Sequence, residues 1–519
     1  MTNKFKALQI GGNDLELLFR DKTNVDWDYL NPTLFTLEND YKDSINAVIK
    51  ERGDFDLVFI QSSYSNELID VLHIVSTPYN TYIDQFYWNE KFESESIVKK
   101  NIIRPFKYTS EYELQEKLKA VTFIGQYGDK IYPKDGIINP NINAQVEYLG
   151  NKSLRIKGDF GERLRPIFSW KRNLVYDKEK VIQIWPEFRV EGAIELEYTF
   201  RIIQSGSIDK IIDKIVLSHD ELINPFEIKR MPFDANISVS IKAKGSGVIE
   251  IGAIHKRWSR LEMGEFLFGG ERYVDNQREE FIYYFNPGDL KPPLNIYFSG
   301  YRTAEGFEAY YMMKDLGAPF LLIADPRIEG GAFYLGSKSY EQAIKNIIKE
   351  KMEYLGFSEK QLILSGLSMG SFAALYYGAQ LGPLGIVVGK PLVNIGTIAD
   401  NMKLLRPEEF GTALDVLLAN EGNISPKHIK SMNDKFWNIF KKTNLKDTIF
   451  AIAYMEQDDY DTNAFSELLP ILTNQQARVM SRGVPGRHND DSPTITNWFI
   501  NFYDIILNSK FGRIKYERK

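Results

Sequence analysis

The sequence predicts an α/β protein in which two regions of alternating strands and helices flank a region of short strands. Near both ends of the chain, short apolar runs of strand length alternate with amphipathic helical patterns. Helical periodicity fades after about residue 125 and returns at about residue 276. The length of 519 residues is also enough for roughly two to four domains. We therefore predict three domains, at residues 1–125, 126–275 and 276–519.

The composition restricts the class of protein. A hydrophobic content of 43% is sufficient for packed cores, and a formal net charge of −6 gives no indication of nucleic-acid binding. The chain has no cysteine, which excludes disulfides, thiolate catalysis and cysteine-ligated metals. Neither a signal-peptide pattern nor an apolar run of about 18 residues is present, so we expect a cytoplasmic protein.

The first region, residues 1–125, predicts an open, Rossmann-like α/β sheet. Apolar runs at residues 5–12 and 55–61 indicate buried strands, and residues 41–53 and 65–75 have the pattern of amphipathic helices. Such alternation is typical of a sheet covered by helices. The glycines after the first strand lack the Gly-x-Gly-x-x-Gly spacing, so no dinucleotide site is predicted.

The middle region, residues 126–275, predicts a β-sandwich. Its runs alternate apolar and polar residues and are separated by turns, as at residues 153–158, 193–203 and 235–260. Alternation of this kind places one side of each strand in a core and the other in solvent.

The last region, residues 276–519, predicts a second parallel sheet. Its five candidate strands are residues 294–300, 318–325, 361–366, 384–389 and 448–455. A mainly helical stretch, at about residues 394–445, lies between the fourth and fifth strands and predicts a helical insertion.

A Gly-x-Ser-x-Gly motif, formed by Gly366, Ser368 and Gly370, lies between the third of these strands and a helical pattern. A sharp strand-to-helix turn exposes the serine oxygen, and larger side chains at the two glycines would collide across it. The motif therefore predicts a nucleophile elbow, with Ser368 as nucleophile and the amide of Met369 in an oxyanion hole. A tight turn without chemistry is the alternative.

A serine nucleophile needs a base, and histidine is the usual one. In α/β-hydrolases the chain order is serine, acid, histidine, which leaves His428 and His488 among the five histidines. His428 lies within the predicted helical insertion. His488 lies in a loop rich in glycine and proline before the last helix, so we predict His488 as the base.

The acid of the triad should follow a strand between the serine and the histidine. Several carboxylates follow the strand at residues 448–455, and such an acid would orient the imidazole and stabilise its protonated form. We predict Asp458 as the acid, with Glu456 as the alternative.

The second donor of an oxyanion hole comes from the loop after an early strand of the same sheet. Gly300 and Tyr301 follow the strand that begins at residue 294, and their amides are the predicted donors. No cluster of histidine and carboxylate residues has the spacing of metal ligands, so we expect neither a metal nor another cofactor.

Taken together, the motifs "GLSMGS", "AYMEQDDYD" and "GVPGRHNDDSP" and the opening "LQIGGNDL" resemble a known family. It is the accessory Sec system secretory protein family of Gram-positive bacteria, in its second, α/β-hydrolase-like member. The resemblance covers essentially the whole chain. Many hydrolases share the serine motif, so the combination carries the specificity.

The resemblance implies O-acetylation of N-acetylglucosamine on serine-rich-repeat glycoprotein adhesins and support for their export. It places the family's serine, acid and histidine on Ser368, Asp458 and His488. The implied partners are other accessory secretory proteins and a dedicated SecA-type motor, at the inner face of the membrane if the protein associates with it. A carbohydrate esterase or deacetylase and a non-catalytic binding subunit are the alternatives, and the acyl donor and the modified sugar position are left open.

Overall fold

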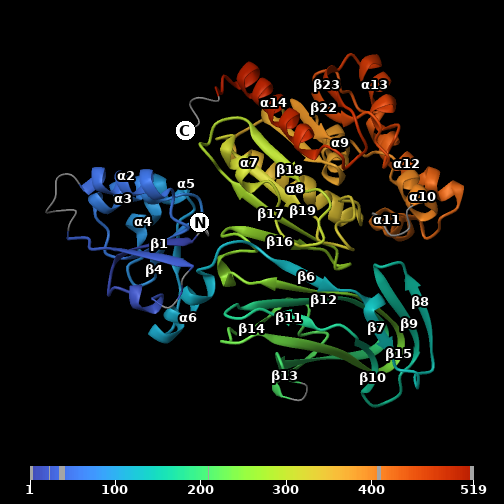
Figure 1. The fold of residues 1–519 in the computed structure, drawn as a ribbon, viewed down its shortest axis with the longest axis horizontal. Coiled ribbons are helices and arrows are strands. Elements are labelled where there is room, and N and C mark those ends of the chain that lie inside the picture. Colours follow the sequence, from blue (N-terminus) through green and yellow to red (C-terminus); the bar gives the residue numbers. More distant parts are fainter. Residues whose placement is uncertain are drawn as a thin grey trace. The chain divides into compact units, whose positions relative to one another are not determined.

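The computed structural model describes residues 4–20, 22, 24–33, 41–207, 210–405 and 411–514. The chain forms two compact units, and Figure 1 shows its three sheets. The first unit comprises Met1–Gln126, Glu179–Val181 and Ser259–Gly270, and the second comprises Tyr127–Lys178, Ile182–Trp258 and Glu271–Lys519. Most residues of the predicted second and third domains thus share one compact unit.

The first unit contains a five-stranded parallel sheet in the order β2-β1-β3-β4-β5. Its strands are β1 (Phe5–Gly11), β2 (Val25–Leu30), β3 (Leu57–Gln61), β4 (Thr81–Asp84) and β5 (Arg104–Phe106). The connecting helices are η1 (Glu16–Leu18), α2 (Tyr41–Arg52), α3 (Asn66–Val75), α4 (Glu90–Ser94), α5 (Ser96–Lys100) and α6 (Glu111–Val121). Alternate residues of β1 enter two separate buried clusters, so both faces of the sheet are covered, as the sequence predicts.

The second unit begins with a ten-stranded sheet. Its strands are β6 (Gly128–Ile131), β7 (Gly136–Ile138), β8 (Ala144–Leu149), β9 (Ser153–Asp159), β10 (Arg165–Trp170), β11 (Leu174–Tyr176), β12 (Ile182–Gln204), β13 (Ile211–Ser218), β14 (Phe226–Ile228) and β15 (Ala235–Trp258). The region consists of strands, as the prediction of a β-sandwich requires. β15 coincides with the predicted run at residues 235–260, whereas β12 is far longer than the predicted run at residues 193–203. They pair antiparallel along nearly their whole length, with one irregularity between Pro186 and Phe188, and so join the region into one connected sheet.

An eight-stranded sheet completes the second unit, in the order β16-β17-β19-β18-β20-β21-β22-β23. Its strands are β16 (Gly270–Val274), β17 (Glu280–Asn286), β18 (Leu294–Phe298), β19 (Phe320–Ala324), β20 (Leu362–Leu367), β21 (Gly385–Gly389), β22 (Ile449–Met455) and β23 (Arg478–Val484). The five predicted strands are β18 to β22, and all are parallel. The sequence missed β23 because this half-exposed edge strand carries no apolar run.

Helices cover both faces of this sheet, and the fold is that of an α/β-hydrolase. The helices are α7 (Tyr310–Asp315), α8 (Lys338–Leu355), α9 (Met369–Leu381), α13 (Ala464–Asn474) and α14 (Ser492–Phe511). Phe298 of β18 stacks on Tyr377 of α9, whereas the neighbouring Tyr297 contacts Phe499 of α14. Because successive strand residues point to opposite faces, α9 and α14 lie on opposite sides of the sheet.

The stretch between β21 and β22 is helical and consists of α10 (Ile395–Leu405), α11 (Thr412–Glu421) and α12 (Pro426–Phe440) (Figure 1). Asp461, which follows β22, accepts hydrogen bonds from the amides of Val393 and Asn394 at 2.8 Å, just before α10 begins. The insertion is therefore tied to the loop after β22. Among the described residues, no helix is both long enough and apolar enough to cross a membrane.

Candidate active site

Ser368 lies at the junction between β20 and α9 in a strained backbone conformation. Its φ of 52° and ψ of −120° fall in a region that non-glycine residues rarely adopt. The turn is fixed by the Ser368 amide, which donates to the carbonyl of Gly389 at 2.8 Å. The serine side chain is half-buried and stands at the carboxyl edge of the parallel strands.

The two glycines of the motif allow this turn by their lack of a side chain. A Cβ atom on Gly370 would lie 2.0 Å from the carbonyl oxygen of Phe298, and one on Gly366 would lie 2.3 Å from the backbone of Gly370. Both distances are far below van der Waals contact, so the sharp bend requires glycine at both positions.

The structure brings Ser368, His488 and Asp458 together. The Oγ of Ser368 is 2.8 Å from Nε2 of His488, and Nδ1 of His488 is 2.8 Å from Oδ2 of Asp458. His488 is 1% exposed and Asp458 is 7% exposed. A neutral imidazole that donates from Nδ1 to the carboxylate leaves Nε2 ready to accept the serine proton.

The loop after β22 holds the acid and the histidine in place. Oδ1 of Asp458 accepts the amides of Tyr460 at 2.9 Å and Asp461 at 3.3 Å. The His488 amide donates to Asp459 at 3.1 Å, and the Tyr460 ring stacks on the imidazole with 4.3 Å between ring centroids. These contacts fix the imidazole from two sides.

Glu456, the alternative acid, lies elsewhere. Its side chain is exposed at the end of β22 and runs beside Gly483 of β23. His428, which the sequence placed in the insertion, is on α12, where its Nδ1 lies 2.7 Å from Ser425 Oγ.

The predicted oxyanion donors have different surroundings. The amide of Met369 is at the first position of α9, where helix geometry offers no acceptor within the helix. The amide of Gly300 donates to Oε2 of Glu308 at 2.7 Å, which gives it a different partner from the predicted oxyanion. We therefore correct the prediction for Gly300 and retain Met369 and Tyr301 as the candidate amides.

Lys390 is a residue of this edge that the sequence did not single out. It directly follows β21, is 7% exposed, and has a φ of 52°. Its Nζ donates to Ser492 Oγ at 3.0 Å. Burial lowers the pKa of the Lys390 ammonium, and the charge of Asp458 partly opposes that shift. The signal available in the sequence was its position directly after a predicted strand.

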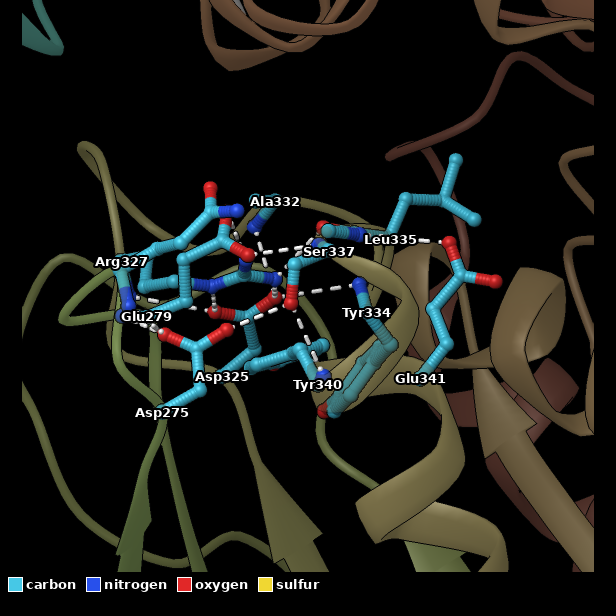
Figure 2. A network of polar contacts seen from close by, with 12 residues as sticks. Asp275, Glu279, Asp325, Arg327, Ala332, Tyr334, Leu335, Ser337, Tyr340 and Glu341 are labelled. Atoms are coloured by element: carbon cyan, nitrogen blue, oxygen red, sulfur yellow. Dashed lines mark hydrogen bonds and ion pairs between the residues drawn. The ribbon is translucent and has the colours of Figure 1, made fainter.

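The loop after β19 is fixed by a second buried network, which Figure 2 shows. The Arg327 guanidinium donates to Asp325 at 2.7 Å and to Glu279 at 3.2 Å, and the amides of Ala332 and Tyr334 donate to Asp325 at 3.0 Å. A cavity of about 350 Å³ lies beside this network, and none of the residues that line it belongs to the triad.

The arrangement has the parts required for acyl transfer through a serine. It contains a serine in a strained turn, a histidine within hydrogen-bond distance of that serine and a buried carboxylate behind the histidine. In the part of the chain that the structure describes, no group of three histidine or carboxylate residues could hold a metal ion.

Comparisons with known proteins match nearly the full chain to accessory Sec system proteins. A family model described as "Accessory Sec system GspB-transporter" matches residues 5–513. An accessory Sec system protein of Staphylococcus aureus is 59% identical over 100% of this chain and 99% of its own length, and one of Streptococcus gordonii is 38% identical over 99% and 100%.

A solved structure of the Glycosylation Associate Protein (Gap123) complex from Streptococcus agalactiae contains a similar chain. It has a TM-score of 0.88 and 34% identity, and the match covers 99% of this chain and 100% of that one. With matches of this extent, the chain belongs to the accessory Sec system GspB-transporter family.

Proposed function

We propose that this protein is a serine-dependent O-acyltransferase that acetylates N-acetylglucosamine on serine-rich-repeat adhesins before their export. The observation that carries the proposal is the continuous chain of contacts from Ser368 through His488 to Asp458, at 2.8 Å each.

In the first half-reaction, Ser368 Oγ attacks the carbonyl carbon of an acyl ester or thioester while His488 Nε2 takes the serine proton. The negative charge on the carbonyl oxygen would be stabilised by the amides of Met369 and Tyr301. Collapse expels the leaving group, which receives the proton from His488, and the acyl group remains on Ser368.

In the second half-reaction, a sugar hydroxyl attacks the acyl-serine. His488 takes the proton of the hydroxyl and returns it to Ser368 Oγ as the serine leaves, so the product is an O-acetyl sugar and the free enzyme. Water would give hydrolysis by the same route. The choice of sugar over water draws its support from membership of the accessory Sec system family.

We further propose that the protein works within an assembly of accessory secretory proteins. Support comes from the similar Streptococcus agalactiae chain, whose structure is that of a complex. In this proposal the assembly acts in the cytoplasm beside the SecA-type motor, with peripheral contact to the membrane, and receives the glycosylated adhesin there.

The proposal is tested by comparing Ser368→Ala with Ser466→Ala, which removes an exposed hydroxyl on α13. A fluorophosphonate probe should label wild type and Ser466→Ala and should fail to label Ser368→Ala. Mass spectrometry of the exported adhesin should show loss of sugar acetyl groups in Ser368→Ala cells alone.

Mass spectrometry of the adhesin also distinguishes an acyltransferase from a carbohydrate esterase. An acyltransferase adds acetyl groups, so the adhesin loses them in Ser368→Ala cells, whereas a deacetylase removes them and the adhesin would gain them. Equal probe labelling of wild type and Ser368→Ala would overturn both assignments.

A further inference from the structure

We propose that Glu305 is a positioning residue for the transfer reaction, through which the ten-stranded sheet holds the loop that carries the Tyr301 amide. This loop, residues 299–309 between β18 and α7, is called the oxyanion loop below. The inference rests on the proposed function, because it assigns a task to the loop only if Ser368 transfers an acyl group.

Glu305 is buried among cations that come from the other sheet. Its carboxylate lies 2.6 Å from His255 Nδ1, 2.6 Å from Arg257 Nε and 3.5 Å from Lys130 Nζ, and its side chain is 0% exposed. The Glu305 amide also donates to the carbonyl of Gly128 at 2.8 Å. We call Glu305 and these three cationic side chains the clamp.

The pairing of β6 with β15 brings the three cationic side chains close together. His255 and Arg257 are two residues apart on β15, so they point to the same face of that strand. Lys130 of β6 is the register partner of His255 in the antiparallel pair β6–β15. The three cations therefore belong to two paired strands, and Glu305 attaches the oxyanion loop to them.

Two further carboxylates lie beside His255 and Arg257, one for each. Nε2 of His255 lies 2.9 Å from Glu187, and Arg257 donates two hydrogen bonds to Glu280, at 2.6 and 2.7 Å. Burial alone would lower the pKa of His255, but Glu305 and Glu187 outweigh burial and raise it. His255 and Arg257 thus each contact a second carboxylate, and Lys130 pairs with Glu305 itself.

The oxyanion loop has further anchors on its own sheet. The Arg302 amide donates to the carbonyl of Gly330 at 3.2 Å, and Lys130, which contacts Glu305, also donates to the carbonyl of Pro326. Gly330 and Pro326 belong to the loop after β19, which the network of Figure 2 holds in place. Tyr301 lies between the strand end and these fixed points, four residues before Glu305.

The position of this amide matters because an oxyanion donor acts through geometry. Donors must already point to the place where charge develops, and a displacement of about 1 Å can cost about 100-fold in rate. Such donors act on the transition state more than on bound substrate, so their loss lowers kcat and leaves KM nearly unchanged.

The test compares Glu305→Gln with Glu280→Gln. The side chains of both glutamates are 0% exposed and both contact Arg257, but Glu280 belongs to β17 and not to the oxyanion loop. With a chromogenic acetyl ester, Glu305→Gln should lose about 10- to 100-fold in kcat at unchanged KM. Glu280→Gln should keep kcat within about threefold, even where both variants lower Tm.

A boronic acid that forms a tetrahedral adduct with Ser368 gives a second readout. Its inhibition constant should rise for Glu305→Gln in parallel with the loss in kcat/KM, and should change little for Glu280→Gln. His255→Gln, which acts on the loop through Glu305, should follow Glu305→Gln. Should Glu305→Gln not fold, His255→Gln and Glu305→Asp decide the question by the same two measurements.

The outcomes separate this inference from the proposed function. If wild type neither reacts with the acetyl ester nor is labelled by a fluorophosphonate, the acyltransferase itself is wrong. If wild type reacts and the folded clamp variants match it, or if Glu280→Gln loses kcat as strongly, the clamp is merely structural and the inference is overturned.

Discussion

Two acidic side chains close together on the loop after β22 have different surroundings. Asp458 is buried behind His488, and Glu456 is exposed beside Gly483. Asp458→Asn should lower kcat by about 10⁴-fold because an amide no longer favours the productive tautomer of the imidazole. Glu456→Gln should stay within about twofold of wild type. Steady-state kinetics decides, and an inactive Glu456→Gln beside an active Asp458→Asn would reverse the assignment of the acid.

The stacking of the Tyr460 ring on His488 leads to a second prediction. It stacks on His488 at an interplanar angle of 7°, and its hydroxyl accepts from Asn489 at 3.1 Å. Tyr460→Phe keeps the stacked ring and should retain most activity, whereas Tyr460→Ala frees the imidazole to rotate and should lower kcat by about tenfold or more. Equal kinetics for the two variants would show that the stacking is dispensable.

At the level of elements, the elbow depends on the close approach of α9 and β18. Gly370→Ala forces a Cβ to within 2.0 Å of the Phe298 carbonyl, so the free energy of unfolding should fall by about 3 kcal/mol or more. Gly385→Ala is the matched control, because its nearest contact would be 3.6 Å. We expect it to change stability by about 1 kcal/mol or less in urea unfolding. A small effect of Gly370→Ala would mean that the turn can relax.

The helical insertion should depend on Asp461. Its carboxylate accepts the amides of Val393 and Asn394 and is 4% exposed, so Asp461→Ala leaves buried donors unsatisfied and should cost about 2 kcal/mol or more. Asp434→Ala removes only an exposed ion pair with Lys430 and should cost about 0.5 kcal/mol or less. Hydrogen exchange in α11 should quicken in the first variant alone. Unchanged hydrogen exchange in α11 would show that the insertion does not depend on this contact.

For the whole molecule, the clamp predicts how stability varies at acid pH. Burial alone would raise the pKa of Glu305, but Arg257, together with His255 and Lys130, holds it at about 2. An unfolded glutamate titrates at about 4.3, so this stabilisation is present above about pH 4.3 and is lost as the pH falls toward 2. Tm should therefore fall less steeply with acid in Glu305→Gln than in wild type. Glu353→Gln, an exposed control on α8, should keep the wild-type slope.

At higher pH, the titration of His255 changes stability in the opposite direction, so that stability falls as the pH rises. The pKa of His255 is raised in the folded protein, so its stabilisation is complete below about pH 6.5 and is lost as the pH rises through the folded value. Wild type should consequently be most stable between about pH 5 and 6.5, and His255→Gln should lack the decline above this window. A wild-type Tm that keeps rising above about pH 7 would contradict a protonated His255.

Local sequence patterns were sufficient for much of the fold. The strands β18 to β22 are short apolar runs, and Ser368 lies between glycines at a strand-to-helix junction, so periodicity and turn chemistry identify them without distant partners. The edge strand β23 and the part of β12 before Ala193 escaped detection. An edge strand needs no apolar run, and the length of a paired strand is set by its partner.

The sequence by itself determined the strands β18 to β22 and the sharp turn at Ser368. Tertiary structure alone decided which carboxylate faces His488, that Gly300 donates to Glu308, and that Glu305 meets His255 and Arg257. The physical reason is the separation along the chain of the residues that encode each feature. A periodicity or a turn is encoded by neighbours in the chain, whereas a buried charge is stable only beside a counter-charge, and here the ion partners are 30 to 50 residues apart.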